Sequence, residues 1–600
     1  MKRYICLLIL LVVGVSACND NFLNTEPTDM LSTEQLVKDP NAVKAYFATL
    51  YDLMPIEDFN FCNGRFNQFP GDGFGYLSNY VDETITSNKY YGSEFGENWK
   101  EIYKLIRNVN DFIVEINKVE EILAPDVLNT YLGEARFIRA YAYFSLVKRF
   151  GGVPVLLEPQ VVVDGDVEKL NIPRNTEDEV WMAIRDDFEF AVQNMTGASE
   201  YGRANKYVAA AYLSRAMLYA GSIAKYGKLE YDGLVGVPAS KANEYFQTSF
   251  NAAKLVYEEG GYELFNKVQD KSKNFSELFL EYESNPEIIL AKGFDYDATK
   301  STHSYDILCT PVYFIPGGYA GRQAPTVDIL EKFEYLDGTV GPILTLNDDG
   351  TRKLYEHPLD LFRDRDPRLL GSVIAPFSQF RGEEISIQKG IHVDGSFKKG
   401  NYYNQYYHSD TKEINTTISS VRATGKYGGS FRSCLSGVYM RKYIDPNTDP
   451  KLLGVWKSRT HWIDMRFAEI LLNMAEAAQE LGTDRTLALT AINMVRERAG
   501  IRLLDDEELT IERIRHEREV ELAFEGHLFW DLKRTRNLVE RFQIWQPRRM
   551  DLYYSLDFNG YFVSFSITDG PKTYENKQYY NRIPQDEINI NPLLKQNPGY

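Results

Sequence analysis

The chain has few cysteines, and it has no long hydrophobic run. Its five cysteines stand at positions 6, 18, 62, 309 and 434, too far apart for a disulfide framework and without the short paired spacings that bind zinc. The longest apolar run, Ile5 to Val13, has nine residues, whereas a membrane-spanning helix needs about 20. These absences exclude a disulfide-rich scaffold, a zinc finger and a helical membrane-spanning protein.

The chain also has fewer positive than negative residues. Lys and Arg total 67 against 85 Asp and Glu, which gives a net charge of −18. A protein whose main task is to neutralise phosphate backbones needs the opposite balance, and no local basic patch stands out. Nucleic acid is therefore not an expected partner.

The common catalytic and metal-binding motifs are missing as well. The sequence holds no His-Glu-x-x-His, no Gly-x-Ser-x-Gly and no P-loop, and its seven histidines lack ligand spacing on a common helix face. A carboxylate pair such as Asp295 and Asp297 could flank a glycosidic bond, but chance pairs are expected among 85 acidic residues. The sequence favours binding over catalysis, and it predicts no catalytic residue, metal or cofactor.

The first residues predict export and anchoring. Two basic residues precede the apolar run, and small residues then lead to Cys18, which is typical of a secretory signal peptide over residues 1–17. The segment Val15-Ser16-Ala17-Cys18 also resembles the bacterial lipobox, in which the cysteine carries the lipid. We therefore expect a mature chain that begins at Cys18 and is tethered to a membrane by acyl chains without spanning it.

Several segments have the periodicity of helices that pack against other helices. They are Tyr131 to Phe150, Lys206 to Tyr226, Ala242 to Glu259, Arg466 to Leu481, Arg485 to Ala499 and about Ile511 to Lys533. Glycine follows most of them, as expected at helix C-termini, and Ala216, Ala220 and Ala224 offer a small-residue face to a neighbouring helix. We predict a mainly α fold, an array of tetratricopeptide-like helical hairpins with long irregular loops and a few short strands.

The segments between these helices have a different composition. They are rich in Gly, Asn, Asp, Ser and Tyr and lack helical periodicity, and they cover Phe59 to Tyr103, Pro286 to Val340, Gly382 to Trp462 and Asp551 to Tyr600. Loops of this length are usually functional. Aromatic rings beside amides and carboxylates suit a sugar, because its C–H face stacks on a ring and its hydroxyls bond to Asn, Asp and Arg.

Most of these rings are expected to pack the loops against the helices, as Trp99 and Tyr103 should. Rings flanked by glycine or polar residues are better candidates for an exposed platform. The predicted ligand-binding residues are Asp72, Tyr76, Tyr80, Asn88, Tyr90, Tyr91, Tyr296, Tyr319 and Arg322. The same rings could hold a peptide or a glycopeptide, whereas a purely structural partner would lack an aromatic platform.

Motifs spread over nearly the whole chain point to one family. They include Ala135 to Tyr141 leading to Phe150-Gly151-Gly152-Val153-Pro154, Arg365-Asp366-Pro367-Arg368, Arg466 to Ala477, Ile492 to Gly500, Glu517 to Arg534, and the ending Ile583 to Tyr600. In these motifs the chain resembles the SusD/RagB family, surface lipoproteins of Bacteroidetes that capture nutrients, mostly glycans, for a TonB-dependent transporter.

The resemblance implies an organisation and a function. It implies one SusD-like domain over residues 18–600, with an N-terminal helical region (18–260), loop-rich insertions (261–465) and C-terminal helices with a tail (466–600). It implies a lipoprotein of the outer membrane that faces the cell exterior, a SusC-like transporter as partner, and no catalysis. The alternatives are a peptide or glycopeptide ligand, or a transporter lid without a ligand site of its own.

One motif of this resemblance is expected to be structural. Five charged residues lie on one predicted helix and its end, as a buried or interhelical ion network would require. They are Glu517, Arg518, Glu521, Glu525 and Asp531.

Overall fold

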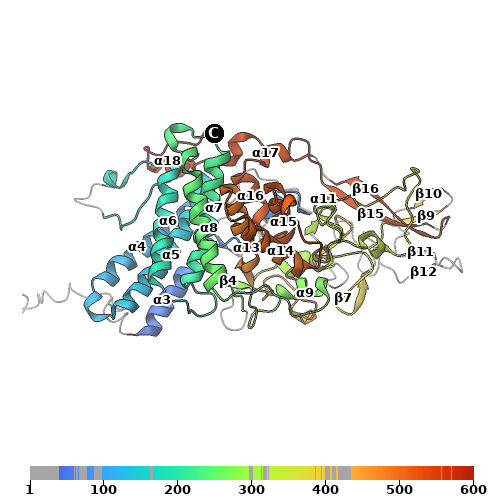
Figure 1. Ribbon diagram of the computed structural model, residues 1–600, viewed down its shortest axis with the longest axis horizontal. Helices are drawn as coiled ribbons and strands as arrows, with labels where there is room; N and C mark the ends of the chain where they lie inside the picture. The colour runs from blue at the N-terminus through green and yellow to red at the C-terminus, as the bar shows by residue number, and fades with distance from the viewer. Residues whose placement is uncertain are drawn as a thin grey trace, which may run out of the picture.

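The molecule consists of a helical half and a strand-rich half. The computed structural model describes residues 39–600 except 60, 63–64, 67–76, 87–97, 162–166, 296–301, 312–313, 315–320, 322, 386, 394, 399–405, 408–413, 416–433, 556 and 569–570. Figure 1 shows the long helices packed side by side at one end, while the strands β9, β10, β15 and β16 extend away from them at the other. The mainly α fold with hairpins of long helices is confirmed.

The first half is an array of six helices in chain order. They are α3 (Pro40–Asp52), α4 (Trp99–Asn117), α5 (Pro125–Phe150), α6 (Glu177–Asn194), α7 (Lys206–Tyr226) and α8 (Ala242–Glu259). Each packs against the next one along the chain. The bounds of α7 and α8 are those predicted, whereas α5 begins at Pro125, six residues before the predicted start. Proline suits this position because its missing N–H would have no partner in the first turn of a helix.

Small residues on α7 set its distance from α8. Ala216, Ala220 and Ala224 are buried, as their four-residue spacing predicted. A Cβ atom added to Gly221 would lie 2.7 Å from a ring carbon of Phe246 on α8. Since no Cβ tolerates such a contact, glycine at this position allows the two helices to approach closely.

The helix ends follow the sequence signals. Five glycines stand directly after helices, namely Gly151, Gly227, Gly260, Gly482 and Gly500. Gly482 and Gly500 have left-handed conformations with φ of 68° and 80°, which other residues adopt at a cost. At the other end of α6, Thr176 and Glu179 form a reciprocal capping box that satisfies two N–H groups of its first turn.

The C-terminal helices pack onto this array. They are α13 (Phe467–Leu481), α14 (Arg485–Ala499), α15 (Ile511–Glu521) and α16 (His527–Arg534), and α13 packs on α8, α14 and α15. The prediction of one helix from Ile511 to Lys533 is wrong. The chain turns between α15 and α16, where Phe524 and Gly526 have φ of 67° and 79°, and the Phe524 N–H donates to Glu83 instead of continuing a helix.

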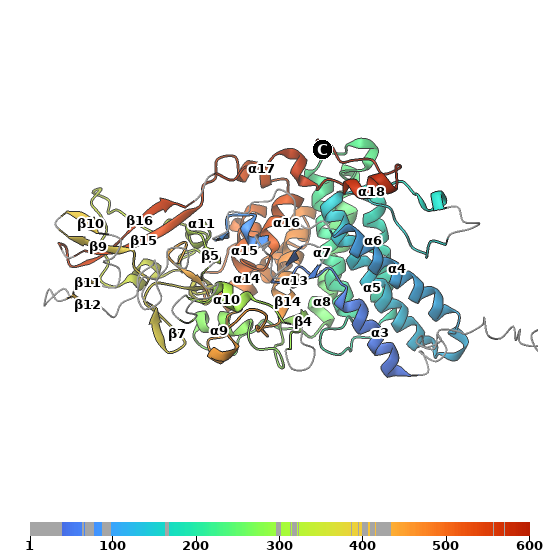
Figure 2. The same ribbon diagram turned by 180° about the vertical axis from the view of Figure 1, so that it is seen from behind.

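Short helices and strands join the two halves. The helices are α9 (Lys271–Leu278), α10 (Tyr305–Cys309), α11 (Val327–Leu330) and α12 (Pro367–Ser372). The short antiparallel pairs are β1 (Phe61–Cys62) with β2 (Arg65–Phe66), β3 (Thr84–Thr86) with β5 (Gln323–Pro325), β4 (Ile288–Lys292) with β14 (Trp462–Arg466), β6 (Val373–Ile374) with β13 (Tyr439–Met440), β7 (Ser378–Phe380) with β8 (Glu383–Ile385), and β11 (Tyr406–Tyr407) with β12 (Ile414–Asn415). From behind, β4, β14 and α10 lie where the two halves meet (Figure 2).

The largest sheet forms the far end of the strand-rich half. Its strand order is β10 (Ser396–Lys398), β9 (Gly390–Val393), β15 (Arg548–Ser555) and β16 (Gly560–Ile567). The hairpin of β15 and β16 pairs eight residues on each side, and it is longer than the short strands predicted for the last loop segment.

After this hairpin the chain returns to the helical half (Figure 1). The helix α17 (Leu538–Arg541) precedes the hairpin and α18 (Gln585–Ile590) follows it. Arg174 donates to the carbonyl of Lys595 and to the side chain of Asn597, each at 2.8 Å, and so fixes the tail beside α6. In the described part of the chain, no helix combines the length and the apolar character needed to cross a bilayer.

Candidate functional site

Most of the predicted site lies outside the described residues. Only Tyr80 of the nine predicted ligand residues is described. The others are Asp72, Tyr76, Asn88, Tyr90, Tyr91, Tyr296, Tyr319 and Arg322, and Cys18 lies outside the described residues too. What the structure does give is the position of the described residues that flank them.

Tyr80 is buried, so the prediction that it belongs to an exposed platform is wrong. Its side chain is 5% exposed, and its ring lies 5.6 Å from that of Phe529 on α16. Its polar neighbours are buried as well: Asn79 accepts from Thr84, and Asp82 pairs with Arg541 at 2.7 Å. Polar flanking residues therefore mark an internal hydrogen-bonded turn here, not a surface.

The strands β3 and β5 bring two of the predicted segments to one place. They are antiparallel, with Thr86 paired to Gln323. The segment that carries Asn88, Tyr90 and Tyr91 begins after Thr86, and the segment that carries Tyr319 and Arg322 ends before Gln323. Both segments are therefore connected to the same end of this strand pair.

A buried aromatic cluster joins the flanks of the other two segments. The ring of Phe59 lies 4.2 Å from that of His303, 4.7 Å from Tyr305 and 6.2 Å from Phe294. Phe59 precedes the segment with Asp72 and Tyr76, while Phe294 and His303 flank the segment with Tyr296. These four rings are buried, so packing against the scaffold is confirmed for them, as it is for Trp99.

The imidazole of His303 is fixed as a neutral group. Burial lowers its pKa to about 3. Its Nδ1 accepts from the Tyr305 N–H at 3.1 Å, and its Nε2 lies 2.9 Å from the carbonyl oxygen of Thr460, to which it donates. His303 is thus a structural histidine of this cluster and is not available for proton transfer.

Beside the cluster, three further rings form a partly exposed surface, the aromatic shelf, consisting of Tyr201, Tyr282 and His461. The rings of His461 and Tyr282 stack at 4.1 Å with an interplanar angle of 16°. The hydroxyl of Tyr201, whose side chain is 50% exposed, is hydrogen-bonded to His461 Nδ1 at 2.9 Å. Burial lowers the pKa of His461 and so favours the neutral form of the ring.

The shelf is assembled from three separate segments. His461 directly precedes β14, Tyr282 lies between α9 and β4, and Tyr201 lies in the turn before α7. Gly202 has a φ of 79° and its backbone lies close to β4, since a Cβ there would be 3.3 Å from the Ala291 carbonyl oxygen. The strand pair and this turn hold the rings in place before any ligand binds.

The shelf has the chemistry that the sequence analysis sought in the loops. Tyr201 is half exposed and the other two rings are partly exposed. Aromatic rings can stack on an apolar ligand surface, and a tyrosine hydroxyl or an imidazole can bond to a ligand hydroxyl. Sequence reasoning missed all three residues because they lie at the margins of the tyrosine-rich segments or outside them. The one local signal was the Tyr201-Gly202 turn between two predicted helices.

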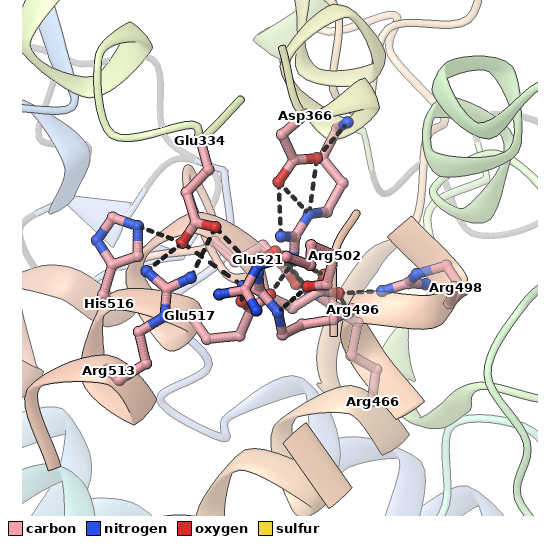
Figure 3. Close-up of polar contacts among 12 residues, drawn as sticks. Glu334, Asp366, Arg466, Arg496, Arg498, Arg502, Arg513, His516, Glu517 and Glu521 are labelled. Atoms are coloured by element: carbon pink, nitrogen blue, oxygen red, sulfur yellow. Dashed lines mark hydrogen bonds and ion pairs between the residues drawn. The ribbon is translucent and has the colours of Figure 1, made fainter. Parts of the chain in front are cut away.

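A network of buried charges surrounds Arg466 at the end of β14 (Figure 3). Arg466, the last residue of β14, pairs with Glu287 at 2.8 Å, Glu521 at 2.5 Å and Glu525 at 2.7 Å. Glu521 also accepts from Arg368 and Arg498. Burial alone would raise the pKa of Glu521, but Arg498, Arg466 and Arg368 together hold it well below its usual range.

The predicted ion network is therefore confirmed. Glu517 pairs with Arg368 and Arg496, each at 2.6 Å, and Arg518 pairs with Asp531 at 2.8 Å. Glu525 also binds Lys442 at 2.6 Å. The arginine partners come from three other parts of the chain, so the network ties the C-terminal helices to β14 and α12.

No metal centre is built from these carboxylates. In the part of the chain described above, no group of three or more His, Cys, Asp or Glu side chains has a geometry that could hold a metal ion. The carboxylates of the ion network are paired with arginine or lysine.

Comparisons with known proteins agree with this fold. A family model described as the SusD family matches residues 286–600, and one described as "Starch-binding associating with outer membrane" matches residues 21–218. SusD-like protein P38 of Formosa agariphila is 24% identical over 90% of this chain and 93% of its own length. A SusD-like protein of Bacteroides ovatus is 22% identical over 100% of this chain and 98% of its own.

Solved structures are similar over nearly the whole chain. A SusD-like protein of Bacteroides fragilis has a TM-score of 0.68 at 24% identity and covers 94% of this chain and 98% of its own. A SusD-like carbohydrate binding protein of the same species has a TM-score of 0.66 at 19% identity, with 93% and 99% covered. At these identities the structural likeness establishes the fold alone.

Proposed function

The chain belongs to the SusD family, whose model matches more than half of its residues, and on this basis we propose that it is a glycan-binding lipoprotein of the cell surface. Cys18 anchors it to the outer membrane on the exterior side. It captures an oligosaccharide or polysaccharide and delivers it, without catalysis, to a SusC-like TonB-dependent transporter.

The aromatic shelf is the observation that carries this proposal. Three rings of Tyr201, Tyr282 and His461 lie together at the surface, two of them stacked in parallel at 4.1 Å. Sugars stack their C–H faces on such rings, and we take each contact to be as strong as a pair of aromatic rings, about 0.5–1.5 kcal/mol beyond the buried area. A few contacts of this size suit a reversible receptor, which has to release its ligand to a transporter.

The predicted loop residues extend the same site. Phe59 and Phe294, which flank two of the loops, contact Trp462 or His303 directly, and Trp462 follows the shelf residue His461 in sequence. One described end of each of these two loops therefore lies close to the shelf. We propose that these tyrosines contribute further stacking contacts to one continuous glycan site.

The comparisons support the ligand class and the location. One matching family model is described as starch-binding and as associating with the outer membrane, and one solved neighbour is described as a carbohydrate binding protein. The transporter partner, the lipid on Cys18 and the outward orientation rest on family membership and on the lipobox-like segment before that cysteine.

Affinity electrophoresis of residues 19–600 tests the proposal, in native gels cast with plant, bacterial, fungal and host glycans. The test variants are Tyr201→Ala and Tyr282→Ala, and the matched control is Tyr231→Ala. Tyr231 is 54% exposed against 50% for Tyr201. It lies beyond the other end of the 21-residue helix α7, which spans roughly 30 Å.

We expect one class of glycan to retard the wild type and the Tyr231→Ala control equally. In Tyr201→Ala the dissociation constant should rise about fivefold to tenfold, as the loss of one stacked ring predicts. Equal retardation of all variants would remove the shelf from the site. Failure of every glycan to retard the wild type would contradict the glycan proposal and favour a peptide or glycopeptide ligand.

A further inference from the structure

A cleft of about 530 Å³ opens beside the aromatic shelf. Its wall includes Tyr282 and Thr460. Because Tyr282 also belongs to the shelf, the cleft and the shelf are adjacent. The other residues that matter here are Lys267, Asp306, Arg459 and Lys457. The volume lies within the range of about 300–1,000 Å³ that is usual for small-molecule sites.

Asp306 is the unusual group in this wall. Its side chain is only 3% exposed, and its Oδ1 accepts no hydrogen bond from any described residue. Burial raises its pKa to about 7, and the Asp445 carboxylate adds to this rise, whereas a hydrogen bond with the Ser458 side chain and the charge of Arg381 oppose it. A buried acceptor without a partner is costly and rare in folded proteins.

Three cations around the cleft and Asp306 have hydrogen bonds to other groups. Lys267 donates to the carbonyl and hydroxyl of Ser284, each at 2.8 Å, and Lys457 donates to the Lys451 carbonyl at 3.1 Å. Arg381 donates to the backbone carbonyls of Asp445 and Thr448. These three cations therefore bond to oxygens other than those of Asp306, and Oδ1 stays without a hydrogen bond from the described residues in the wall of the cleft.

We propose that the cleft is an additional sugar subsite, in which one hydroxyl of a glycan residue donates to Asp306 Oδ1 while the rest of the glycan lies over the shelf. This inference rests on the proposed function and adds a second contact region to it. Tyr282 connects the two regions, because its ring stacks on His461 and also lines the cleft.

The chemistry favours a hydroxyl over an ammonium group. A carboxyl that is partly protonated at neutral pH suits a hydroxyl, because a hydroxyl can donate to the carboxylate and accept from the carboxylic acid. An ammonium group needs the ionised form, and it would also meet the lysines and the arginine in the same wall. The subsite therefore fits a neutral sugar residue.

The test uses size-fractionated oligosaccharides of one to six residues, released by partial acid hydrolysis from whichever glycan retards the wild type. Calorimetric titration of the chain gives the dissociation constant for each length. The variants are Asp306→Leu, which removes the acceptor, and Asp306→Asn, which keeps a carbonyl oxygen in the same place. Glu283→Gln is the control, because it removes a neighbouring, exposed carboxylate that does not line the cleft.

For the wild type and Glu283→Gln we expect affinity to rise stepwise with length, up to the length that fills both regions. Asp306→Leu should lose the last step, about tenfold in affinity, and should bind the shorter oligosaccharides as the wild type does. Asp306→Asn should keep most of the step. If Asp306→Leu does not fold, Asp306→Ala removes the same acceptor and should lose the last step while Asp306→Asn keeps most of it.

Other outcomes overturn the proposal. Loss of the last step in Asp306→Asn as well would exclude a neutral hydroxyl and indicate a cationic group. Equal affinities of Asp306→Leu and the wild type at every length would remove the subsite, yet the proposed function would stand if Tyr201→Ala still weakened binding. If no glycan retards the wild type, the proposed function and the subsite fail together.

Discussion

Two buried carboxylates of this protein have opposite surroundings. Glu521 lies in the ion network, is fully buried and accepts from Arg368, Arg466 and Arg498. Asp306 lies in the wall of the cleft, is 3% exposed and has one oxygen without a hydrogen bond from the described residues. Burial is nearly the same in both places, so the difference lies in the partners that the fold supplies.

The pKa values of the two groups follow from those partners. The arginines hold the pKa of Glu521 well below its usual range, whereas burial without a paired cation raises the pKa of Asp306 to about 7. A compensated carboxylate fixes the scaffold, because breaking its pairs leaves unmatched charges in a low-dielectric interior. A buried carboxylate without a paired cation destabilises the fold, and it is expected where a ligand supplies the missing partner.

The largest effect should come from breaking the network. Glu521→Gln leaves three arginines short of one negative charge, so the free energy of unfolding should fall by about 3–5 kcal/mol. Urea denaturation followed by circular dichroism measures it. The exposed Glu507 provides the control, since Glu507→Gln should change stability by less than about 0.5 kcal/mol. A loss below about 1 kcal/mol in Glu521→Gln would contradict the structural role of the network.

Asp306→Asn should act in the opposite direction. The folded pKa of Asp306 lies above its value of 3.8 in the unfolded chain, so the wild type loses stability as the pH rises from about 4 to 7 and carries the full cost above 7. The variant lacks this titration. Without ligand it should be more stable than the wild type by about 1–3 kcal/mol at pH 8 and nearly equal to it at pH 4.

Urea denaturation of both proteins at the two pH values measures this difference. A variant that is less stable than the wild type at pH 8 would mean that the Asp306 carboxylate is compensated in the folded protein. Asp306 would then be a structural carboxylate like Glu521 and not part of a ligand site.

The smallest effect is expected for an ion pair at the surface. Lys44 and Glu200 pair at 2.7 Å, but both side chains are more than half exposed. Water screens such pairs, so Lys44→Ala should change the free energy of unfolding by less than about 1 kcal/mol. A change as large as that of Glu521→Gln would show that burial is not what distinguishes the network.

The scaffold could be predicted from the sequence to a greater extent than the site. Periodicity and terminal glycines predicted α7, α8 and α14 with the ends that are observed, because those signals depend only on neighbouring residues. The break between α15 and α16 was missed, since a left-handed Phe524 has no sequence signature. The charges of Glu517 to Asp531 were recognised as a network, but their partners Arg368 and Arg466 lie far away in the sequence.

The site depends on tertiary contacts that composition does not encode. Tyr201, Tyr282 and His461 come from three segments and meet only because the β4–β14 pair and the turn before α7 lie together. Tyr80 was predicted as exposed from its polar neighbours, yet those neighbours bond to one another inside the fold. Asp306 looks like any other aspartate in the sequence, because the absence of a partner is a property of the folded chain.

The comparison is tested most directly by urea denaturation of wild type and Asp306→Asn at pH 8, with and without the oligosaccharide that fills the shelf and the cleft. A ligand that completes Asp306 stabilises the wild type by an amount set by its affinity. We predict that Asp306→Asn has a higher urea midpoint than the wild type without ligand. When both proteins are saturated with the oligosaccharide, the midpoint of the variant should be at least as high as that of the wild type. A wild type that is already the more stable protein without ligand would contradict the claim that this oxygen is left for a sugar.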